Sequence, residues 1–375
     1  MFSNILKSRI KVMTCFCLTF CLSLFALSGC DHKGEAVAQY DNYKMEAGEY
    51  NVILIQEIFD AQSQLVTSFG ATSQPSDPSK MISEGTIEDK PAIDYIKEQS
   101  TKWIKILLFA RAECDKLGIS LSEEEENTIK DSIEKSYDQI DKLYNVSKFG
   151  ISKESFIQFE EDSKRLNLLC GELFGEGKSK AIPNEEIDKY TKEHGVKYKV
   201  VSIDKPLTEN DESVAKTLKN EGVQNIKALV DKYMSQIAAN KSIDDINAAY
   251  NKASEKPEAA LEYTFQYDDQ DFEEKELVLS IKSNSPATLK EDDDAYYIIQ
   301  RFDVDKESIE KERNSSRSIL TSKAVKEYFD DIVEKSDIKI NQSAIDSHNP
   351  VDMASALQQK RSTEKSSSSD NDNEE

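Results

Sequence analysis

The chain has 375 residues and a formal charge of −23 at pH 7, from 48 basic and 71 acidic side chains. This length suffices for about two domains, and an apolar content of 38% suffices for a sizeable core. Because binding to a phosphate backbone needs a basic face, the charge argues against nucleic acid as a partner.

Residues 1–29 have the pattern of an export signal. Three basic residues precede an apolar run over residues 12–27, and small residues follow this run. A transmembrane helix is the alternative, but the run is shorter than the roughly 20 residues that a span requires, so a cleaved signal peptide is favoured. Cleavage would remove three basic residues and no acidic one, which takes the net charge from −23 to −26.

The signal ends in Leu27-Ser28-Gly29-Cys30, which resembles the lipobox of bacterial lipoproteins. The resemblance implies that Cys30 carries a diacylglycerol and becomes the first residue of the mature chain. Two acyl chains give stable anchoring where one would not. We therefore expect a lipid-anchored protein on the extracytoplasmic face of the cell membrane, with residues 30–39 as a polar tether.

The mature chain keeps two further cysteines, Cys114 and Cys170, each among apolar helix positions. Three cysteines in a chain of this length are no disulfide framework. Two buried thiols are the favoured interpretation, and a Cys114–Cys170 disulfide is the alternative. The three histidines lie far apart without metal-ligand spacing, so no cofactor and no metal are expected.

Residues 40–195 predict a helical domain. Apolar residues recur at helical spacing from about residue 50, and residues 70–91, rich in Gly, Pro and Ser, predict a long loop. A helix is expected over Ala92–Leu117 with Gly118 as its stop, and Ser122 with Glu125 forms a capping box for the next helix. Further helices are expected from about Ser152 and over residues 183–190.

Residues 196–305 predict a smaller α+β module inserted into the helical chain. A strand near residues 197–203 leads to a long amphipathic helix, a shorter helix over residues 242–250, and a strand through 261–267. A short apolar run over 277–281 follows. The β-branched and aromatic stretch Ala295–Val304 predicts a buried closing strand.

The closing strand, with Tyr296-Tyr297-Ile298-Ile299, resembles the last strand of a parvulin-type prolyl isomerase, in which a tyrosine-histidine pair precedes two isoleucines. The order strand, two helices, strand, short helix and strand is similar to that family as well. The resemblance places the catalytic histidines at about Lys199 and at Tyr297, so neither histidine is present. A charged, solvated Lys199 would not replace an imidazole. Phe265, Phe272 and Tyr297 are candidate peptide-binding residues, or simply sheet core.

Residues 306–342 predict a helix that returns to the helical domain and completes it, followed by a short strand at 338–340. Residues 343–375 are polar and end in serine and acidic runs, which predicts a disordered tail. The helix order, with the Gly118-Ile119 break and Glu185-Glu186-Ile187 before the module, resembles the PrsA-like and SurA-like extracytoplasmic foldases.

This resemblance implies a fold of class α+β, a mostly helical chaperone domain with an inserted parvulin-like domain. It implies a membrane-anchored foldase that binds unfolded, newly exported polypeptides, with weak or absent prolyl isomerase activity. Two alternatives stay open: a non-enzymatic surface lipoprotein that binds one specific partner, and a true isomerase with altered pocket residues. The sequence does not indicate an oligomeric state.

Overall fold

The computed structural model of the chain describes residues 36–69, 78–206, 211–257, 260–272 and 275–357, and its fold is of the mixed α+β class, as expected. It divides into two compact units. We call Ile182–Thr321 the insert unit, and we call the residues before and after it the helical unit, because both flanks belong to one compact body.

The helical unit contains a small antiparallel sheet in the order β2-β1-β9. Strands β1 and β2 precede the helices in the chain, and β9 follows most of them. Most of its length is helix, and its last described residues, 350–357, are also helical. Its elements are β1 (Ala36–Tyr40), β2 (Tyr43–Glu46), α2 (Ala47–Phe69), α3 (Pro78–Glu84), β3 (Thr86–Ile87), β4 (Lys90–Pro91), α4 (Ala92–Leu117), α5 (Glu123–Tyr144), a 3-10 turn (Val146–Phe149), α6 (Lys153–Phe174), the second half of α12 (Lys306–Lys335), β9 (Lys339–Ile340) and α13 (Gln342–Asp346).

Local chemistry sets the helix ends as the sequence predicted. Helix α4 ends at Gly118, whose φ of 68° lies in the left-handed region that glycine tolerates. Helix α5 begins after Ser122, whose side chain accepts from the backbone N–H of Glu125 while the Glu125 carboxylate accepts from the backbone N–H of Ser122. Both the predicted bounds of α4 and the predicted capping box are confirmed.

Three predictions for the helical unit were wrong. Residues 36–39, expected in the tether, form most of strand β1, and Val37 is buried there. Residues 78–91, expected as loop, form α3 and a β-hairpin. Residues 343–357, expected in the disordered tail, are largely helical, because a few apolar side chains, Ile345 among them, are buried in the core.

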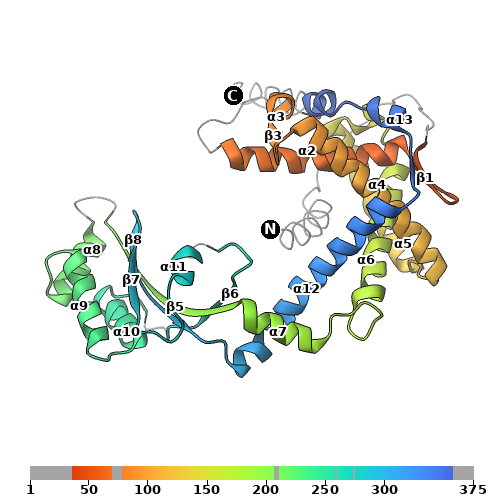
Figure 1. The fold of residues 1–375 in the computed structure, drawn as a ribbon. Helices are drawn as coiled ribbons and strands as arrows, with labels where there is room; N and C mark the ends of the chain where they lie inside the picture. Colours follow the sequence, from red (N-terminus) through yellow and green to blue (C-terminus); the bar gives the residue numbers. More distant parts are fainter. Residues whose placement is uncertain (1–35, 70–77, 207–210, 258–259, 273–274, 358–375) are drawn as a thin grey trace, which may run out of the picture. The chain divides into compact units, whose positions relative to one another are not determined.

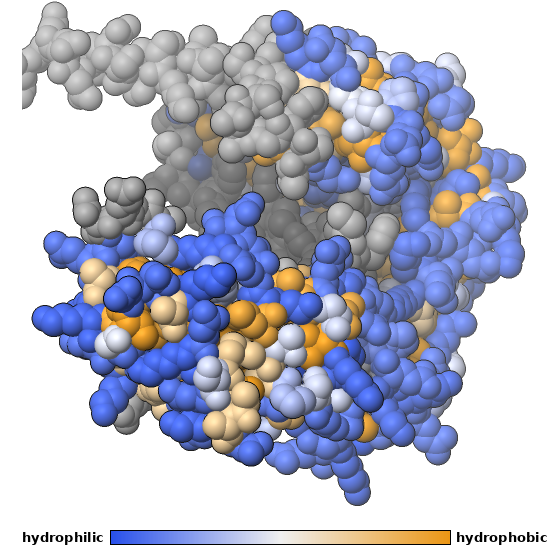
Figure 2. Space-filling view, turned by 60° about the vertical axis from the view of Figure 1, so that its left-hand side comes forward, coloured by the Kyte–Doolittle hydropathy of each residue, from blue (hydrophilic) through white to orange (hydrophobic). Residues whose placement is uncertain are grey.

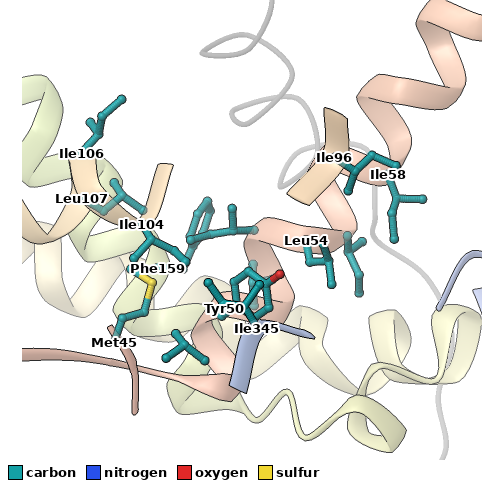
Figure 3. Packing of buried hydrophobic residues seen from close by; sticks show 14 of the residues in the cluster. Met45, Tyr50, Leu54, Ile58, Ile96, Ile104, Ile106, Leu107, Phe159 and Ile345 are labelled. Atoms are coloured by element: carbon teal, nitrogen blue, oxygen red, sulfur yellow. The ribbon is translucent and has the colours of Figure 1, made fainter. Parts of the chain in front are cut away.

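One core joins the two ends of the helical unit. Figure 3 shows Met45 of β2, Tyr50 and Leu54 of α2, Ile104 of α4 and Ile345 of α13 packed in the same region. Strand β9 pairs antiparallel with β1, and the backbone N–H of Asn341 donates to the Val37 carbonyl over 2.8 Å. The residues after the insert unit are therefore required to complete this core.

A buried ionic network links α2, α4 and α6 within the helical unit. Arg111 donates to both carboxylate oxygens of Asp162, with Nε 3.0 Å from Oδ1, and to Glu49 Oε1 over 2.8 Å. Arg165 donates to Asp162 over 2.8 Å. Asp162 is fully buried, and burial raises the pKa of Glu49 to about 9 although Arg111 lowers it.

The insert unit holds a four-stranded antiparallel sheet in the order β6-β5-β8-β7. Three helices separate its first two strands, and one short helix separates the second strand from the last pair. Its elements are α7 (Asn184–His194), β5 (Gly195–Asp204), α8 (Glu212–Glu221), α9 (Ile226–Ala238), α10 (Ile243–Ala253), β6 (Thr264–Tyr267), α11 (Lys275–Leu279), β7 (Thr288–Glu291), β8 (Ala295–Phe302) and the first half of α12 (Lys306–Lys335).

The single long helix expected after β5 is two helices. Gly222 adopts a φ of 67° and ends α8, and Asn225 caps the start of α9 by accepting from the Ala228 backbone N–H over 2.8 Å. Strand β6 also begins at Thr264 instead of near Leu261. The sequence does contain signals for the end of α8 and the start of α9, Gly222 and Asn225, but the helical spacing of apolar residues continues across them.

The insert unit is also wider than the predicted 196–305, because α7 and the first half of α12 pack on its sheet. The rings of Tyr190 and Tyr267 stack at 5.5 Å, and the hydroxyl oxygens of Tyr267 and Ser316 lie 2.8 Å apart. Arg313 forms two 2.8 Å hydrogen bonds to the Asp188 carboxylate. The unit therefore runs from Ile182 to Thr321.

The two faces of this sheet are covered differently (Figure 1). Helices α8, α9 and α10 pack on one side, against Val201 and Ile203, and we call this the three-helix face. The short helix α11 packs on the other side, against a cluster that contains Tyr198 and Ile299, and we call this the α11 face. Figure 2 shows hydrophilic side chains over most of the visible surface, with hydrophobic ones in smaller groups.

Candidate functional site

The α11 face carries an aromatic cluster around the closing strand. Phe272 stacks on Tyr198 with ring centres 6.1 Å apart and an interplanar angle of 23°. Tyr297 packs on the same cluster, half-buried. The predicted candidates Phe272 and Tyr297 thus pack against the same cluster, which also contains Tyr198.

The Tyr297 hydroxyl is already engaged. It donates to Asp292 Oδ2 over 2.8 Å. The backbone N–H of Ala295 and the Tyr297 hydroxyl both lower the pKa of Asp292, which keeps this carboxylate charged as the acceptor. At this position a phenol therefore donates to an anion, where the isomerase pattern has an imidazole.

Lys199 does lie on the strand adjoining that of Tyr297, but the two side chains do not face each other. In the register of β5 and β8, Lys199 pairs with Gln300 while Ser202 pairs with Tyr297. Because side chains alternate between faces along a strand, Lys199 points to the three-helix face and Tyr297 to the α11 face. The residues of β5 on either side of Lys199, Tyr198 and Val200, share the face of Tyr297.

The sequence predicted that Lys199 is a solvated charge, but the side chain is buried. Its residue exposure is 8%, and its ammonium nitrogen lies 2.7 and 2.9 Å from the two carboxylate oxygens of Asp244 on α10. The predicted equivalence of Lys199 with a catalytic histidine was therefore wrong in both its face and its environment.

Phe265 is separated from the other two candidates. It lies on β6 opposite Lys197, which places it on the three-helix face. There it packs with Tyr190 of α7, Tyr267, and Ile319 and Leu320 of α12. Phe265 thus belongs to the packing of α7 and α12 on the sheet, and the core interpretation holds for it.

A second aromatic arrangement lies on the three-helix face, and we call it the Tyr263 site. The ring centre of Tyr263 is 4.3 Å from the Lys197 ammonium nitrogen and 4.4 Å from that of Lys199. The Phe302 ring meets it edge-on, with centres 5.1 Å apart and an interplanar angle of 87°. Tyr263 remains 48% exposed. Lys197 is paired with Asp305 over 2.7 Å and holds the pKa of that carboxyl well below its usual range.

Neither β5 nor β8 contains a histidine. Within the ranges that the structure describes, no group of three or more His, Cys, Asp and Glu side chains is placed to hold a metal ion. The two arrangements offer aromatic and hydrogen-bonding contacts.

The predicted lipid attachment residue, Cys30, lies outside the described residues. Among those described, no helix combines the length and the apolar character needed to cross a membrane. Cys114 and Cys170 are free thiols, as favoured from the sequence, and burial raises their pKa values to about 11 and about 12.

Sequence reasoning missed Tyr198 and the Tyr263 site. A second register of β5 against β8 would have brought Tyr198 to the face of Tyr297, but alternation alone does not choose between the two registers. The Tyr263 site had no signal in the sequence, since Tyr263 precedes its strand and its neighbours come from β5 and β8. No protein-family model matches the chain, and no curated protein matches it in sequence.

Proposed function

We propose that the protein is a membrane-anchored extracytoplasmic foldase that binds unfolded, newly exported polypeptides, with weak or absent prolyl isomerase activity. Cys30 is the lipid attachment residue in this proposal, and the insert unit is a parvulin-like domain that serves as a peptide-binding lobe. No cofactor is needed for such an activity.

One observation carries the proposal. A small sheet unit with helices on both faces interrupts a helical unit, and the helical unit is completed only by the residues that follow the insert. The order of elements in the insert supports the parvulin-like part: a strand, helices, a second strand, a short helix and a closing strand, with one further edge strand, β7. This is the arrangement that the resemblance to the foldases implies.

The proposed loss of isomerase activity follows from the side chains on the α11 face. Rotation about a peptide bond crosses a barrier of about 18–20 kcal/mol, so catalysis requires a pocket that twists and desolvates the amide. Here Tyr198 is stacked on Phe272 and the Tyr297 hydroxyl is bound to Asp292. Neither side chain is free to replace a histidine pair.

Aggregation assays on the chain beginning at residue 31 test the proposal. Light scattering should fall when this protein is added to several unrelated, chemically unfolded proteins as they are diluted into buffer. Protection of none of them would refute the foldase function. Capture of one dominant partner from an extracytoplasmic extract, without protection in the scattering assay, would instead support a lipoprotein that binds a single partner.

The isomerase part has its own assay. The cis–trans exchange of a proline tetrapeptide should run at the uncatalysed rate in the presence of the protein. A rate above background that falls in a Tyr297→Ala variant would show that the altered pocket is active.

A further inference from the structure

The three-helix face is not covered uniformly by helices. Helices α8 to α10 pack on Val201, Ile203 and Ile298, and α7 with α12 packs on Phe265 and Tyr267. The β5 side chains Lys197 and Lys199 lie between these two parts. The side chain that lies over both of their ammonium groups is the ring of Tyr263.

We call Lys197, Lys199 and Phe302 the floor of the Tyr263 site, and this floor is firmly held. Lys199 is almost fully buried and has two hydrogen bonds to Asp244, and Lys197 is paired with Asp305. Phe302 lies in β8, which pairs along its whole length with β5. The ion pairs hold the two ammonium groups and the strand pairing holds the backbone of Phe302, and none of these contacts involves Tyr263.

Tyr263 itself is held much less. The ladder between β5 and β6 starts at Thr264, so Tyr263 has no strand partner. About half of its surface is exposed. Its ring makes the two cation–π contacts and the edge contact with Phe302. The ring can therefore leave the floor without breaking the sheet.

The chemistry of the floor favours an aromatic occupant over an anionic one. Each ammonium group already has a carboxylate partner, which leaves little net charge to attract a second anion. The electron-rich face of a ring still attracts two ammonium groups, and the edge of Phe302 gives the geometry that aromatic pairs prefer.

We propose that Lys197, Lys199 and Phe302 form a subsite for an aromatic side chain of an unfolded polypeptide, and that Tyr263 occupies this subsite when no client is bound. Unfolded chains expose the Phe, Tyr and Trp side chains that folded proteins bury, so such a subsite distinguishes the two. The identity of the occupant as a client rests on the proposed foldase function. The site itself lies on the face opposite to Tyr297.

Fluorescence anisotropy with two labelled peptides tests the subsite. Both probes are unstructured Gly/Ser decapeptides, one with a single central Phe and the other with Leu at the same place. The proteins are the chain from residue 31 and its variants Tyr263→Ala, Tyr263→Ala/Lys197→Met and Leu117→Ala. Leu117 is the matched control, because it is also 48% exposed but lies at the end of α4. Circular dichroism confirms that each variant is folded.

Removing the Tyr263 ring should strengthen peptide binding. If Tyr263 occupies the subsite in most molecules, only the remaining fraction can bind the peptide, and the apparent affinity is reduced by that fraction. We expect Tyr263→Ala to bind the Phe peptide about fivefold or more tightly than the parent chain, with a smaller change for the Leu peptide. Adding Lys197→Met should remove the preference for Phe, and Leu117→Ala should bind as the parent does.

An unchanged or weaker affinity of Tyr263→Ala for the Phe peptide would overturn the subsite. If the parent chain still suppresses aggregation in that case, the foldase function stands and only this inference fails. Conversely, tighter binding by Tyr263→Ala in a chain that protects no unfolded protein would support the subsite and refute the foldase function.

Discussion

Exchanging one oxygen for a nitrogen at two neighbouring carboxyl groups should have very different effects on the helical unit. Asp162 is fully buried and accepts from Arg111, Arg165 and Gln158. Glu49 is also buried but accepts from Arg111 alone in this network. The perturbations are Asp162→Asn and Glu49→Gln, each nearly isosteric with the parent side chain.

The structure gives the size of each effect. Asp162→Asn leaves two largely buried guanidinium groups facing a neutral amide, and breaking a buried ion pair in this way costs about 3–5 kcal/mol. Burial raises the pKa of Glu49 to about 9, so this side chain is protonated at neutral pH. A glutamine oxygen can still accept from Arg111, so Glu49→Gln should cost about 1 kcal/mol or less at pH 7.

The same pKa fixes how stability depends on pH. In the unfolded chain the pKa of Glu49 is near 4.5, the ordinary value for a glutamate, whereas in the folded chain burial raises this pKa to about 9. Between these values the folded state binds more protons, so the free energy of unfolding falls as the pH rises, by up to about 1.4 kcal/mol per pH unit. Glu49→Gln should remove this dependence.

Urea unfolding followed by tryptophan fluorescence measures both effects. The chain has one tryptophan, Trp103, which lies on α4 and packs against the core of the helical unit. Unfolding of the parent, Glu49→Gln and Asp162→Asn is compared at pH 6, 7 and 8. Equal losses in the two variants at pH 7, or the same pH dependence in the parent and in Glu49→Gln, would refute the reasoning.

Three further predictions concern packing and thiols. Ile345→Ala should destabilise the helical unit by about 2–5 kcal/mol in the same urea assay, because Ile345 is fully buried; no loss would mean that the C-terminal residues do not complete the core. Gly195→Ala should disrupt the insert unit, since an added Cβ would lie 2.3 Å from the Thr191 carbonyl oxygen; rapid proteolysis of this unit with an unchanged Trp103 transition is expected, and parental resistance would contradict it. Cys114 and Cys170, with pKa values raised by burial, should react with a disulfide reagent at pH 8 at least about a hundredfold more slowly in the folded chain than in urea, and equal rates would contradict this.

The sequence predicted best where a few adjacent residues decide the structure. The end of α4 at Gly118 and the start of α5 at Ser122 depend on a left-handed residue and on a side chain that caps the next turn. Such signals need no distant partner. The predicted bounds of α4 therefore match those in the structure.

Prediction from the sequence failed where a segment is ordered by contact with another segment far away in the chain. Residues 343–357 look polar, yet Ile345, Met353 and Leu357 are buried against the core, and β9 pairs with β1 some three hundred residues earlier. Composition records how many apolar residues a segment has, but it does not record whether another segment offers a surface for them. The same limit applies to residues 36–39, which form a strand because β2 and β9 flank them.

The candidate site shows a third kind of limit, which is the face of the sheet to which a given side chain points. The predicted pairing of strands was right, since β5 and β8 adjoin, but an error of one residue along a strand moves a side chain to the other face of the sheet. Lys199 and Tyr198 are such neighbours. A pattern of alternating polar and apolar residues cannot settle the choice here, because helices cover both faces and both Lys199 and Tyr198 are buried.

The alternation of side chains along the strands also separates the two proposed binding surfaces of the insert unit, the α11 face and the three-helix face. Tyr198 and Tyr297 belong to the α11 face, while Lys199 and Tyr263 belong to the three-helix face. The sheet backbone separates these two layers of side chains. In the proposed foldase, polypeptide binding at the Tyr263 site would therefore not depend on isomerase activity at the α11 face.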